Sequence, residues 1–565
     1  MTSSCLIILP IHLFDINTLY HSLESLDSLH SSTLKDIYII EEPIYFGDRD
    51  VKLNFNKLKL IYHRASMKYY FDYLQENKNT SKNTSKNISK NISIMNAKLT
   101  YINYDELKKK STPFYKTVLK EHSKIYMFNP VDTYLESKYS KKNYFGNKLE
   151  YIESPLFLCT NKDLEDFHKS KPNPTSYTHA SFYKWQRSRL HILEKDKTYD
   201  TENRNKMPLD TKIPPLPKND SGSSNPNCKY LIEAIDYIEH HFPNNLEPLY
   251  VSSVSSSPKK LTPESIHFPI THKSSILWLE HFCKNRLEKF GEYEDSIDSI
   301  PRNFLFHSTI SPMINSGLIT PEQVIEIVSN YYEKNKKINA SIGIATYEGF
   351  IRQVIGWREY QRYIYKYIGD KMRESNHFKN NRKLSPEWYK ATTGIKPVDD
   401  AIMLAINDGY IHHILRLMVV GNVMNLVGIH PDEVYKWFME FSMDSYDWVM
   451  IGNVYSMTLW ADGGLTMRKP YISGDGYIMK MGNYSSTKIK TKKKSQTNIT
   501  HTTNTESDWN SIWNTIFHHF IDRNQEQLSK TYYNGIVKAW NKKTEKAKEE
   551  ELIIARNYIN KISTI

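Results

Sequence analysis

A chain of 565 residues and 66.5 kDa is too long for one hydrophobic core, so two or three domains are expected. Its hydrophobic fraction of 39% excludes a wholly disordered protein. No apolar run approaches the roughly 20 residues of a membrane span, and residues 5–14 lack the basic start and cleavage site of a secretory signal. We therefore expect a soluble, intracellular protein with no membrane partner. The formal net charge of +12 permits nucleic-acid binding but serves solubility equally well.

The cysteines are few and scattered, at Cys5, Cys159, Cys228 and Cys283. No C-x-x-C spacing occurs, which argues against a zinc ribbon or an iron–sulfur site built from clustered thiolates. Scattered cysteines also fit a reducing compartment.

The first 160 residues alternate between two periodicities. Short apolar runs of strand length lie at residues 5–9, 36–40, 98–104, 124–128 and 155–159, and a longer helical pattern fills 58–74. Strands that alternate with helices predict an α/β domain with a parallel sheet over residues 1–160. Residues 77–95 carry a near-repeat of Asn, Ser and Lys, which indicates a solvated low-complexity insertion.

The segment 161–261 is predicted to be an inter-domain linker, because residues 196–228 hold many Asn, Lys, Pro and Ser and few apolar groups. From 262 to 540 the pattern predicts an all-helical domain without a sheet. Thr320-Pro-Glu-Gln323 opens one helix with a reciprocal cap, and further helices are expected over 348–367, 411–427 and from His430. Residues 485–505 are predicted to be a basic loop, and 541–565 a charged surface helix.

Several residues could carry chemistry, although the Walker, G-x-G-x-x-G, H-E-x-x-H and G-x-S-x-G motifs are absent from the sequence. Glu348, Arg352, Arg358, Glu359 and Arg362 form the densest charge set on an apolar helix. This pattern is typical of a solvated face, but it also suits fork-shaped donors for a diphosphate or a buried charge network. The His412-His413 pair, like the other two such pairs, is interpreted as one core and one surface histidine.

Three blocks together resemble the photolyase-related branch of the cryptochrome/photolyase family. They are Glu348-Gly-Phe-Ile-Arg-Gln-Val-Ile-Gly-Trp-Arg-Glu-Tyr, Tyr410-Ile-His-His-Ile-Leu-Arg-Leu-Met-Val-Val-Gly-Asn, and Ala461-Asp-Gly-Gly-Leu followed by Lys469-Pro-Tyr-Ile-Ser. The resemblance runs from about residue 5 to about 540, outside the insertions. It implies an antenna-type α/β domain and an all-α domain that binds FAD. It also implies UV-damaged DNA as the partner, and we expect a monomer.

The resemblance assigns residues to three roles. For FAD binding it implies Ser308, Thr309, Ser311, Glu348, Arg352, Arg358, Asp444, Asp447 and Asn453. For the chemistry it implies His413 as a proton donor to the lesion, with Trp437 and Trp448 near the flavin, where electron hopping begins. For DNA contact it implies Arg204, Lys469, Tyr471 and Tyr477. On its own, the aromatic pattern around Trp437 and Trp448 favours core packing.

The chain departs from the family pattern at several positions. The four cysteines that hold the family's iron–sulfur cluster correspond to Pro397, Ser485, Lys488 and Ser507, so no cluster is expected, and Trp509 and Trp513 are expected to hold this end by packing. Met450 stands where family members often have Glu. Thr392 stands at an expected Trp of the electron chain, for which Trp388 is the candidate substitute. Glu41, Glu42 and Tyr45 follow the second strand, where the family binds a lumazine-type antenna pigment, but the local match does not assign that site.

Three functions fit these features. The first is light-driven repair of dipyrimidine lesions by electron transfer from reduced FAD, as in a DNA photolyase. The second is a cryptochrome-like blue-light photoreceptor without repair activity, which the changes at Met450 and Thr392 favour. The third is a degenerate homologue that binds nucleic acid. The sequence leaves the lesion type open.

Overall fold

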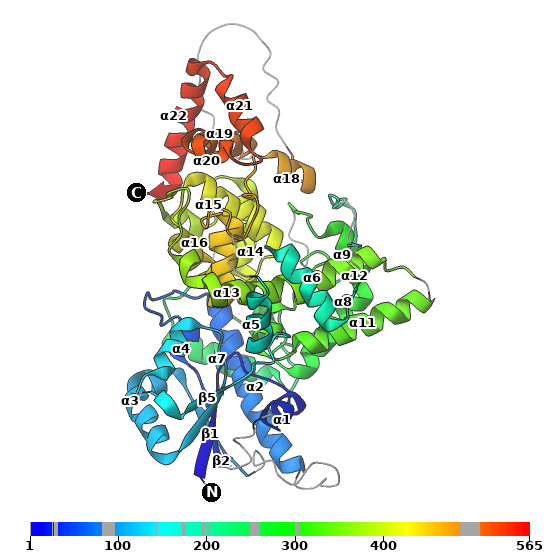
Figure 1. The fold of residues 1–565 in the computed structure, drawn as a ribbon, viewed down its shortest axis with the longest axis vertical. Helices are drawn as coiled ribbons and strands as arrows, with labels where there is room; N and C mark the ends of the chain where they lie inside the picture. The colour runs from blue at the N-terminus through cyan, green and yellow to red at the C-terminus, as the bar shows by residue number, and fades with distance from the viewer. Residues whose placement is uncertain are drawn as a thin grey trace.

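The structure is a computed structural model of the whole chain (Figure 1). It describes residues 2–24, 26, 32–81, 96–142, 144–171, 177–194, 198–199, 204–248, 260–299, 304–338, 340–485 and 509–565. Most of the low-complexity insertion predicted at 77–95 and nearly all of the basic loop predicted at 485–505 lie outside these residues.

A five-stranded parallel sheet forms the N-terminal part, as predicted. The strands are β1 (Thr2–Ile8), β2 (Ser32–Ile40), β3 (Lys98–Ile102), β4 (Lys124–Phe128) and β5 (Leu149–Ile152), in the order β3-β2-β1-β4-β5. Helices α1 (Ile16–Glu24) and α2 (Lys57–Ser81) lie on one side of the sheet, and α3 (Tyr104–Glu121) and α4 (Thr133–Ser140) on the other (Figure 1). Right-handed crossovers produce this division, because the chain moves outward from β1 to β3 and then returns to β4 and β5.

The predicted strand at 155–159 is wrong. The fifth strand is β5, and the residues after it form an irregular turn. Glu359, from the helical part, accepts hydrogen bonds from the backbone N–H groups of Leu158 and Cys159, both at 3.0 Å. These donors are therefore occupied by a buried carboxylate instead of a neighbouring strand.

Helix α2 joins the two parts of the molecule. Its first half is buried on every side, since it lies between the sheet and the helical part. The buried polar groups of α2 find partners across that boundary: the Lys59 ammonium donates to the backbone oxygens of Met439 (2.9 Å) and Ser445 (2.8 Å). Burial lowers the pKa of Lys59 to about 7.

The segment predicted to be a linker carries three helices. They are α5 (Asn161–Lys169), α6 (His179–Leu190) and α7 (Cys228–His241). Helix α7 packs along α2, and α6 packs against the turn η6 (Arg352–Arg358) of the helical part. This segment therefore adds packed helices to both parts of the molecule.

Helices build the rest of the chain. In order they are α8 (His272–Asn285), α9 (Leu287–Tyr293), α10 (Ser311–Ser316), α11 (Pro321–Ile338), α12 (Ile344–Ile351), α13 (Glu359–Arg373), α14 (Lys396–Asp408), α15 (Asn422–Val427), α16 (Pro431–Phe441), α17 (Asp447–Ile451), α18 (Gly476–Met481), α19 (Trp509–Arg523), α20 (Gln525–Ser529), α21 (Asn534–Asn541) and α22 (Glu545–Ile562). The predicted cap of α11 is confirmed, because the N–H of Thr320 donates to Gln323 Oε1 (2.9 Å) and the N–H of Gln323 to Thr320 Oγ1 (3.2 Å).

The expectation that the helical part contains no sheet is wrong at one place. Strand β6 (Lys383–Leu384) pairs antiparallel with β7 (Ser563–Thr564), directly after α22. Leu552, Ala555 and Ile559 of α22 are buried, and the helix packs against α19. The predicted C-terminal helix thus exists, but one of its faces belongs to the core. Among the described residues, no helix has the length and apolar character needed to cross a membrane.

Candidate functional site

A cavity of about 740 Å³ opens into the helical part of the molecule. Three π-helical turns contribute to its wall: η6 (Arg352–Arg358), η8 (Leu415–Gly421) and η9 (Gly452–Thr458). Each interrupts an otherwise α-helical stretch, so the residues on either side are rotated relative to a regular helix. Wide turns of this kind occur often at functional sites, and a volume of this size suits a cofactor or a drug-sized ligand.

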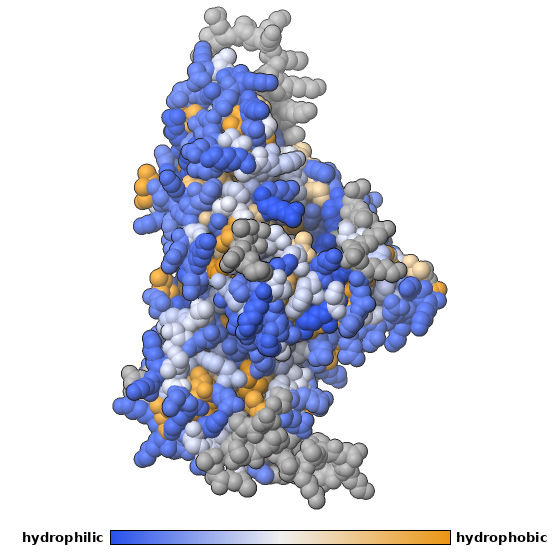
Figure 2. Space-filling view, viewed as in Figure 1, coloured by the Kyte–Doolittle hydropathy of each residue, from blue (hydrophilic) through white to orange (hydrophobic). Residues whose placement is uncertain are grey.

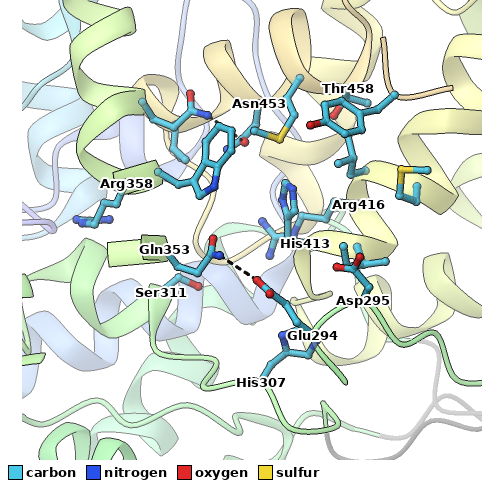
Figure 3. Close-up of a pocket in the computed structure, with 18 of the residues that line it drawn as sticks. Glu294, Asp295, His307, Ser311, Gln353, Arg358, His413, Arg416, Asn453 and Thr458 are labelled. Carbon is cyan, nitrogen blue, oxygen red and sulfur yellow. Dashed lines mark hydrogen bonds between the residues drawn. The ribbon is translucent and has the colours of Figure 1, made fainter. Parts of the chain in front are cut away.

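Most of the residues singled out from the sequence line this one cavity. They are Arg204, Ser308, Thr309, Ser311, Arg352, Arg358, His413, Asp444, Trp448, Asn453, Lys469, Tyr471 and Tyr477. Figure 3 shows His413 near the middle of the lining, with Ser311 and Arg358 to one side and Thr458 and Asp295 to the other. Residues separated by more than 250 positions in the chain therefore meet in one place.

Glu348 does not line the cavity. Its fully buried carboxylate faces the linker segment, where it pairs with Arg187 (3.5 Å) and accepts hydrogen bonds from the Tyr183 hydroxyl (3.2 Å) and the backbone N–H of Tyr199. These contacts tie the linker to α12. In this structure Glu348 positions the chain rather than facing the predicted cofactor site.

Asp447 is also outside the lining. Its carboxylate accepts a hydrogen bond from Tyr365 (2.6 Å), pairs with Arg373 (2.7 Å), and lies 3.7 Å from Arg49. Arg49 reaches it from the α/β part, where it also pairs with Asp132 (3.0 Å). Burial alone would raise the pKa of Asp447, but Arg49 and Arg373 lower it to about 2. Asp447 is therefore the anionic centre of a charge network that joins the two parts.

Trp437 is buried beneath the cavity wall. Its ring stacks on Phe441 at 4.3 Å between centroids, and its indole N–H donates to the backbone oxygen of Trp388 (3.0 Å). The neighbouring residue Phe438 lines the cavity instead. Trp448 does line it, and packs edge-on against Phe157.

Arg358 is the cation with the least compensation in the cavity wall. One of its terminal nitrogens donates to the Leu156 backbone oxygen (3.1 Å) and the other to Asn315 Oδ1, while its Nε has no hydrogen-bond partner. Among the described residues, no carboxylate lies within 4.0 Å of its guanidinium. Burial lowers its pKa to about 10. A half-buried guanidinium of this kind favours an anionic ligand.

A second charged group, formed by Asp444 and Arg416, closes another part of the wall. The two side chains pair at 2.9 Å, and the Ser311 hydroxyl donates to the other carboxylate oxygen (2.6 Å). The backbone oxygen of Asp444 accepts from Asn315 (2.9 Å). Because Asn315 also contacts Arg358, the two groups of charge are connected and rigid.

His413 presents its ring to the cavity, while His412 is buried behind it and stacks on His307 at 4.4 Å. The surrounding protein and then Arg416 lower the pKa of His413 to about 4. Burial lowers the pKa of His412 still further. The imidazole that faces the cavity is therefore neutral at physiological pH.

The segment 308–311 forms part of the wall through a strained turn. Thr309 has a left-handed backbone, with φ of 52°, which is unfavourable for a β-branched residue. The Trp278 indole holds the turn in place, donating to the Ser308 oxygen (3.0 Å) and to Thr309 Oγ1 (3.1 Å). Strain that is held by its surroundings is typical of functional sites.

The mouth of the cavity brings acids against the predicted DNA-facing residues. Arg204 pairs with Glu294 at 2.6 Å, and Gln353 donates to the other Glu294 oxygen at 2.9 Å (Figure 3). The neighbouring Asp295 raises the pKa of Tyr477, after burial as the larger cause. The groups predicted to contact DNA are therefore held by carboxylates in the free protein.

Sequence reasoning did not single out Arg416, Gln353, Glu294 or Asp295. Arg416 lies three residues after His413 within a quoted block, and Gln353 follows Arg352, so block membership was the available signal. Glu294 and Asp295 follow α9 in a segment with no motif, and only the folded structure brings them to the cavity.

Comparisons with known proteins bear on this architecture. A family model described as deoxyribodipyrimidine photo-lyase-related protein matches residues 16–247. A (6–4) photolyase of Agrobacterium fabrum is 30% identical over 397 residues, which cover 69% of this chain and 70% of the relative. The chain belongs to the photolyase/cryptochrome family, in its photolyase-related branch. The resemblance and the fold class predicted from the sequence are thus confirmed.

Other similar proteins span smaller or more distant parts of this photolyase-related chain. An uncharacterised protein of Acanthamoeba polyphaga mimivirus is 40% identical over 148 residues, which cover 26% of this chain and 100% of the relative. The crystal structure of a bacterial class III photolyase from Agrobacterium tumefaciens overlaps with a TM-score of 0.48 at 13% identity, covering 83% of this chain and 81% of that chain.

Packing holds the region where the family's cluster cysteines correspond to other residues. Pro397 lies in the first turn of α14, and the Ser485 oxygen accepts from the Trp509 indole (3.4 Å). The Tyr484 hydroxyl donates to Asp400 of α14 (2.9 Å), and Trp509 and Trp513 are buried. Lys488 and Ser507 lie outside the described residues.

The predicted antenna residues of this photolyase-related chain are occupied by protein contacts. Glu41 accepts from Arg64 (2.8 Å) and the Tyr101 hydroxyl (2.6 Å), and Glu42 pairs with Lys138 (2.6 Å). All of these carboxylate contacts come from the protein itself, so neither glutamate presents a free carboxylate to a pigment.

Proposed function

We propose that this photolyase-related chain binds FAD in the cavity of the helical part and uses light to repair dipyrimidine lesions in DNA. The observation that carries the proposal is Arg358, a cation in the cavity wall whose Nε has no partner and which lacks a carboxylate within ion-pair distance among the described residues. A dinucleotide cofactor supplies such an anionic partner through its diphosphate.

The residues present fit this cofactor. Arg352 and Arg358 would hold its phosphates together with the Ser308–Thr309 turn, and Asn453 and Asp444 would face its ring system. Asp444 is already fixed by Arg416 and Ser311, so the wall does not need to rearrange. When bound and reduced, FAD supplies the light-driven electron transfer that reverses the damage.

The chain's own residues would shape the reaction around the lesion. His413 is neutral and donates one hydrogen bond through its ring N–H. An anionic substrate beside it raises its pKa, so the same ring is suited to deliver a proton once DNA is bound. Trp448, Phe438 and Met450 supply an apolar wall that excludes water from the cavity.

Flavin binding tests the first half of the proposal. The purified protein, reconstituted with FAD if it emerges colourless, should bind about one equivalent, measured by absorbance after gel filtration. Arg358→Gln should weaken FAD binding by ~10-fold or more, because it removes the charge on the cavity wall. Lys469→Gln is the matched control, since Lys469 lies exposed at the mouth, and it should bind FAD like the wild type. Equal binding by Arg358→Gln and wild type would contradict the assignment.

Lesion repair tests the second half. Oligonucleotides with cyclobutane dimers and with (6–4) products are illuminated with blue light in separate reactions, and restored bases are counted by chromatography. His413→Ala should lose repair and still bind FAD, because its ring contacts substrate rather than the charged wall. Full repair by His413→Ala would overturn the role of this histidine.

A cryptochrome-like photoreceptor is the second candidate, and Met450 favours it. This residue lines the cavity where family members often have Glu, and its sulfur accepts only from the Ser445 hydroxyl (3.4 Å). A thioether cannot accept hydrogen bonds as a carboxylate does. Normal flavin photoreduction with unchanged lesions of both kinds would support this candidate. Nucleic-acid binding without flavin would support a degenerate homologue.

A further inference from the structure

Tyr532 is a large aromatic residue held in solvent beside the cavity. It is 82% exposed and lies in the turn between α20 and α21. Its sequence neighbour Tyr533 lines the cavity, whereas Tyr532 points away from it. Most of the face drawn in Figure 2 is hydrophilic, with hydrophobic residues in small separate spots, so an aromatic ring this exposed requires an explanation.

The turn that presents Tyr532 is rigid. The Tyr533 hydroxyl donates to the backbone oxygen of Ile472 (2.6 Å) and accepts from the N–H of Ile472 (3.3 Å). The N–H of Tyr533 donates to Thr531 Oγ1 (3.2 Å), whose hydroxyl donates to the Leu528 oxygen (2.8 Å). One residue, Tyr533, therefore closes the cavity wall and fixes the exposed ring at its rim.

A cation stands next to the ring. The Lys469 ammonium lies 5.4 Å from the Tyr532 centroid, within cation–π distance. Lys469 is itself part of the cavity lining, and Arg468 beside it is exposed. In the part of the chain that the structure describes, neither residue forms an ion pair with a carboxylate. The rim thus combines positive charge with a fixed aromatic face.

We propose that Tyr532 and Lys469 form a platform on which an unpaired DNA base stacks at the mouth of the cavity. Exposed aromatic rings beside cations are the usual means of binding single-stranded nucleic acid without sequence preference. Turning a base into the cavity leaves neighbouring bases unstacked, and a fixed ring at the rim offers them a new stacking surface. The inference rests on the proposed function, since it assumes that DNA reaches this cavity.

Binding of undamaged DNA in the dark tests the platform without the light reaction. Fluorescence anisotropy is measured on the full chain with a single-stranded oligonucleotide and with a fully paired duplex. Tyr532→Ala should weaken single-strand binding by about tenfold and duplex binding by less than about twofold. Tyr532→Trp should bind the single strand like the wild type. Lys469→Gln should weaken both DNAs and reduce the salt dependence by about one counterion.

Ile338→Ala is the matched control, because Ile338 is 83% exposed at the end of α11, away from the cavity lining. It should change neither affinity. Equal single-strand binding by Tyr532→Ala and wild type would overturn the platform, as would a wild type that binds neither DNA. If Tyr532→Ala loses single-strand binding while no lesion is repaired by the wild type, the platform stands and the repair proposal fails. Full repair with no effect of Tyr532→Ala on binding gives the opposite result.

Discussion

Arg204 and Glu294 pair at 2.6 Å at the edge of the cavity, and Gln353 donates to the second oxygen of the same carboxylate. Both charged side chains are only 16% exposed. The arginine predicted to reach DNA is therefore bound to an internal anion, and a phosphate must compete with Glu294 for it.

Glu294→Gln should consequently strengthen DNA binding. Neutralising the carboxylate leaves Arg204 available to one more phosphate, so the plot of log affinity against log salt concentration should steepen by about one. Anisotropy titrations at several salt concentrations measure this slope. Glu292→Gln is the control, because Glu292 is on the same segment but outside the cavity lining. An unchanged slope in Glu294→Gln would show that Arg204 does not contact DNA.

Asp447→Asn should destabilise the protein without changing its flavin content. Removing this buried anion leaves Arg49 and Arg373 without their shared partner, which costs about 3 kcal/mol when the partly exposed position of Arg373 is considered. Urea unfolding measures the free-energy change, and absorbance measures bound flavin per folded protein. A stable variant with little flavin would instead support Asp447 as a cofactor ligand.

The histidines of the core should make the protein sensitive to acid. Burial lowers the pKa of His12 and of His63 to about 3, below the value of about 6.5 in an unfolded chain. Between these values the unfolded chain binds more protons, so stability is complete above about pH 6.5 and falls as the pH decreases. Each group contributes a loss of about 1.4 kcal/mol at about pH 5.5.

His63→Phe tests this pH dependence. Neither ring nitrogen of His63 has a hydrogen-bond partner, and aromatic rings surround it, so phenylalanine can replace it. Its unfolding free energy should decline less than that of the wild type between about pH 7.5 and 5.5, by about 1.4 kcal/mol. Parallel declines in the two proteins would mean that His63 is protonated in the folded state.

Gly452→Ala should disturb the π-helical wall of the cavity. A Cβ at this position would lie 1.8 Å from Gln361 Oε1, which forces Gln361 away from its contact with Asn453 (3.3 Å). The expected loss is roughly 1–3 kcal/mol in unfolding free energy. Adding Gln361→Ala to Gly452→Ala removes the clashing group and should recover part of that loss. A double mutant as unstable as the sum of both changes would contradict this cause.

The sequence predicted the strands at the centre of the sheet and the cap of α11, because period-two apolar runs and Thr320-Pro-Glu-Gln323 are local signals. It failed at residues 155–159, where the apolar run is strand-like but Glu359, about 200 positions away, takes the backbone donors. Helix α2 was predicted from its periodicity. Its burial on every side depends on a second layer of structure that one segment cannot reveal.

The candidate site was predicted as a set of residues, but not in the direction of each side chain. Arg352 and Arg358 reach the cavity, whereas Glu348, four positions before Arg352, faces the linker. Regular helical geometry would place Glu348 and Arg352 on one face. The π-helical turn η6 begins at Arg352, and sequence patterns do not signal such a turn.

The turn η6 also fixes the angle between two buried anchors, with Glu348 before it holding Tyr199 and Glu359 after it holding Leu158 and Cys159. Loss of a single codon within residues 352–358 would return the helix to regular winding and rotate everything downstream by about 100°. One of the two glutamates would then have to release its loop. The exact length of this helix is therefore under as much constraint as its composition, and in-frame deletions here should be less tolerated than substitutions.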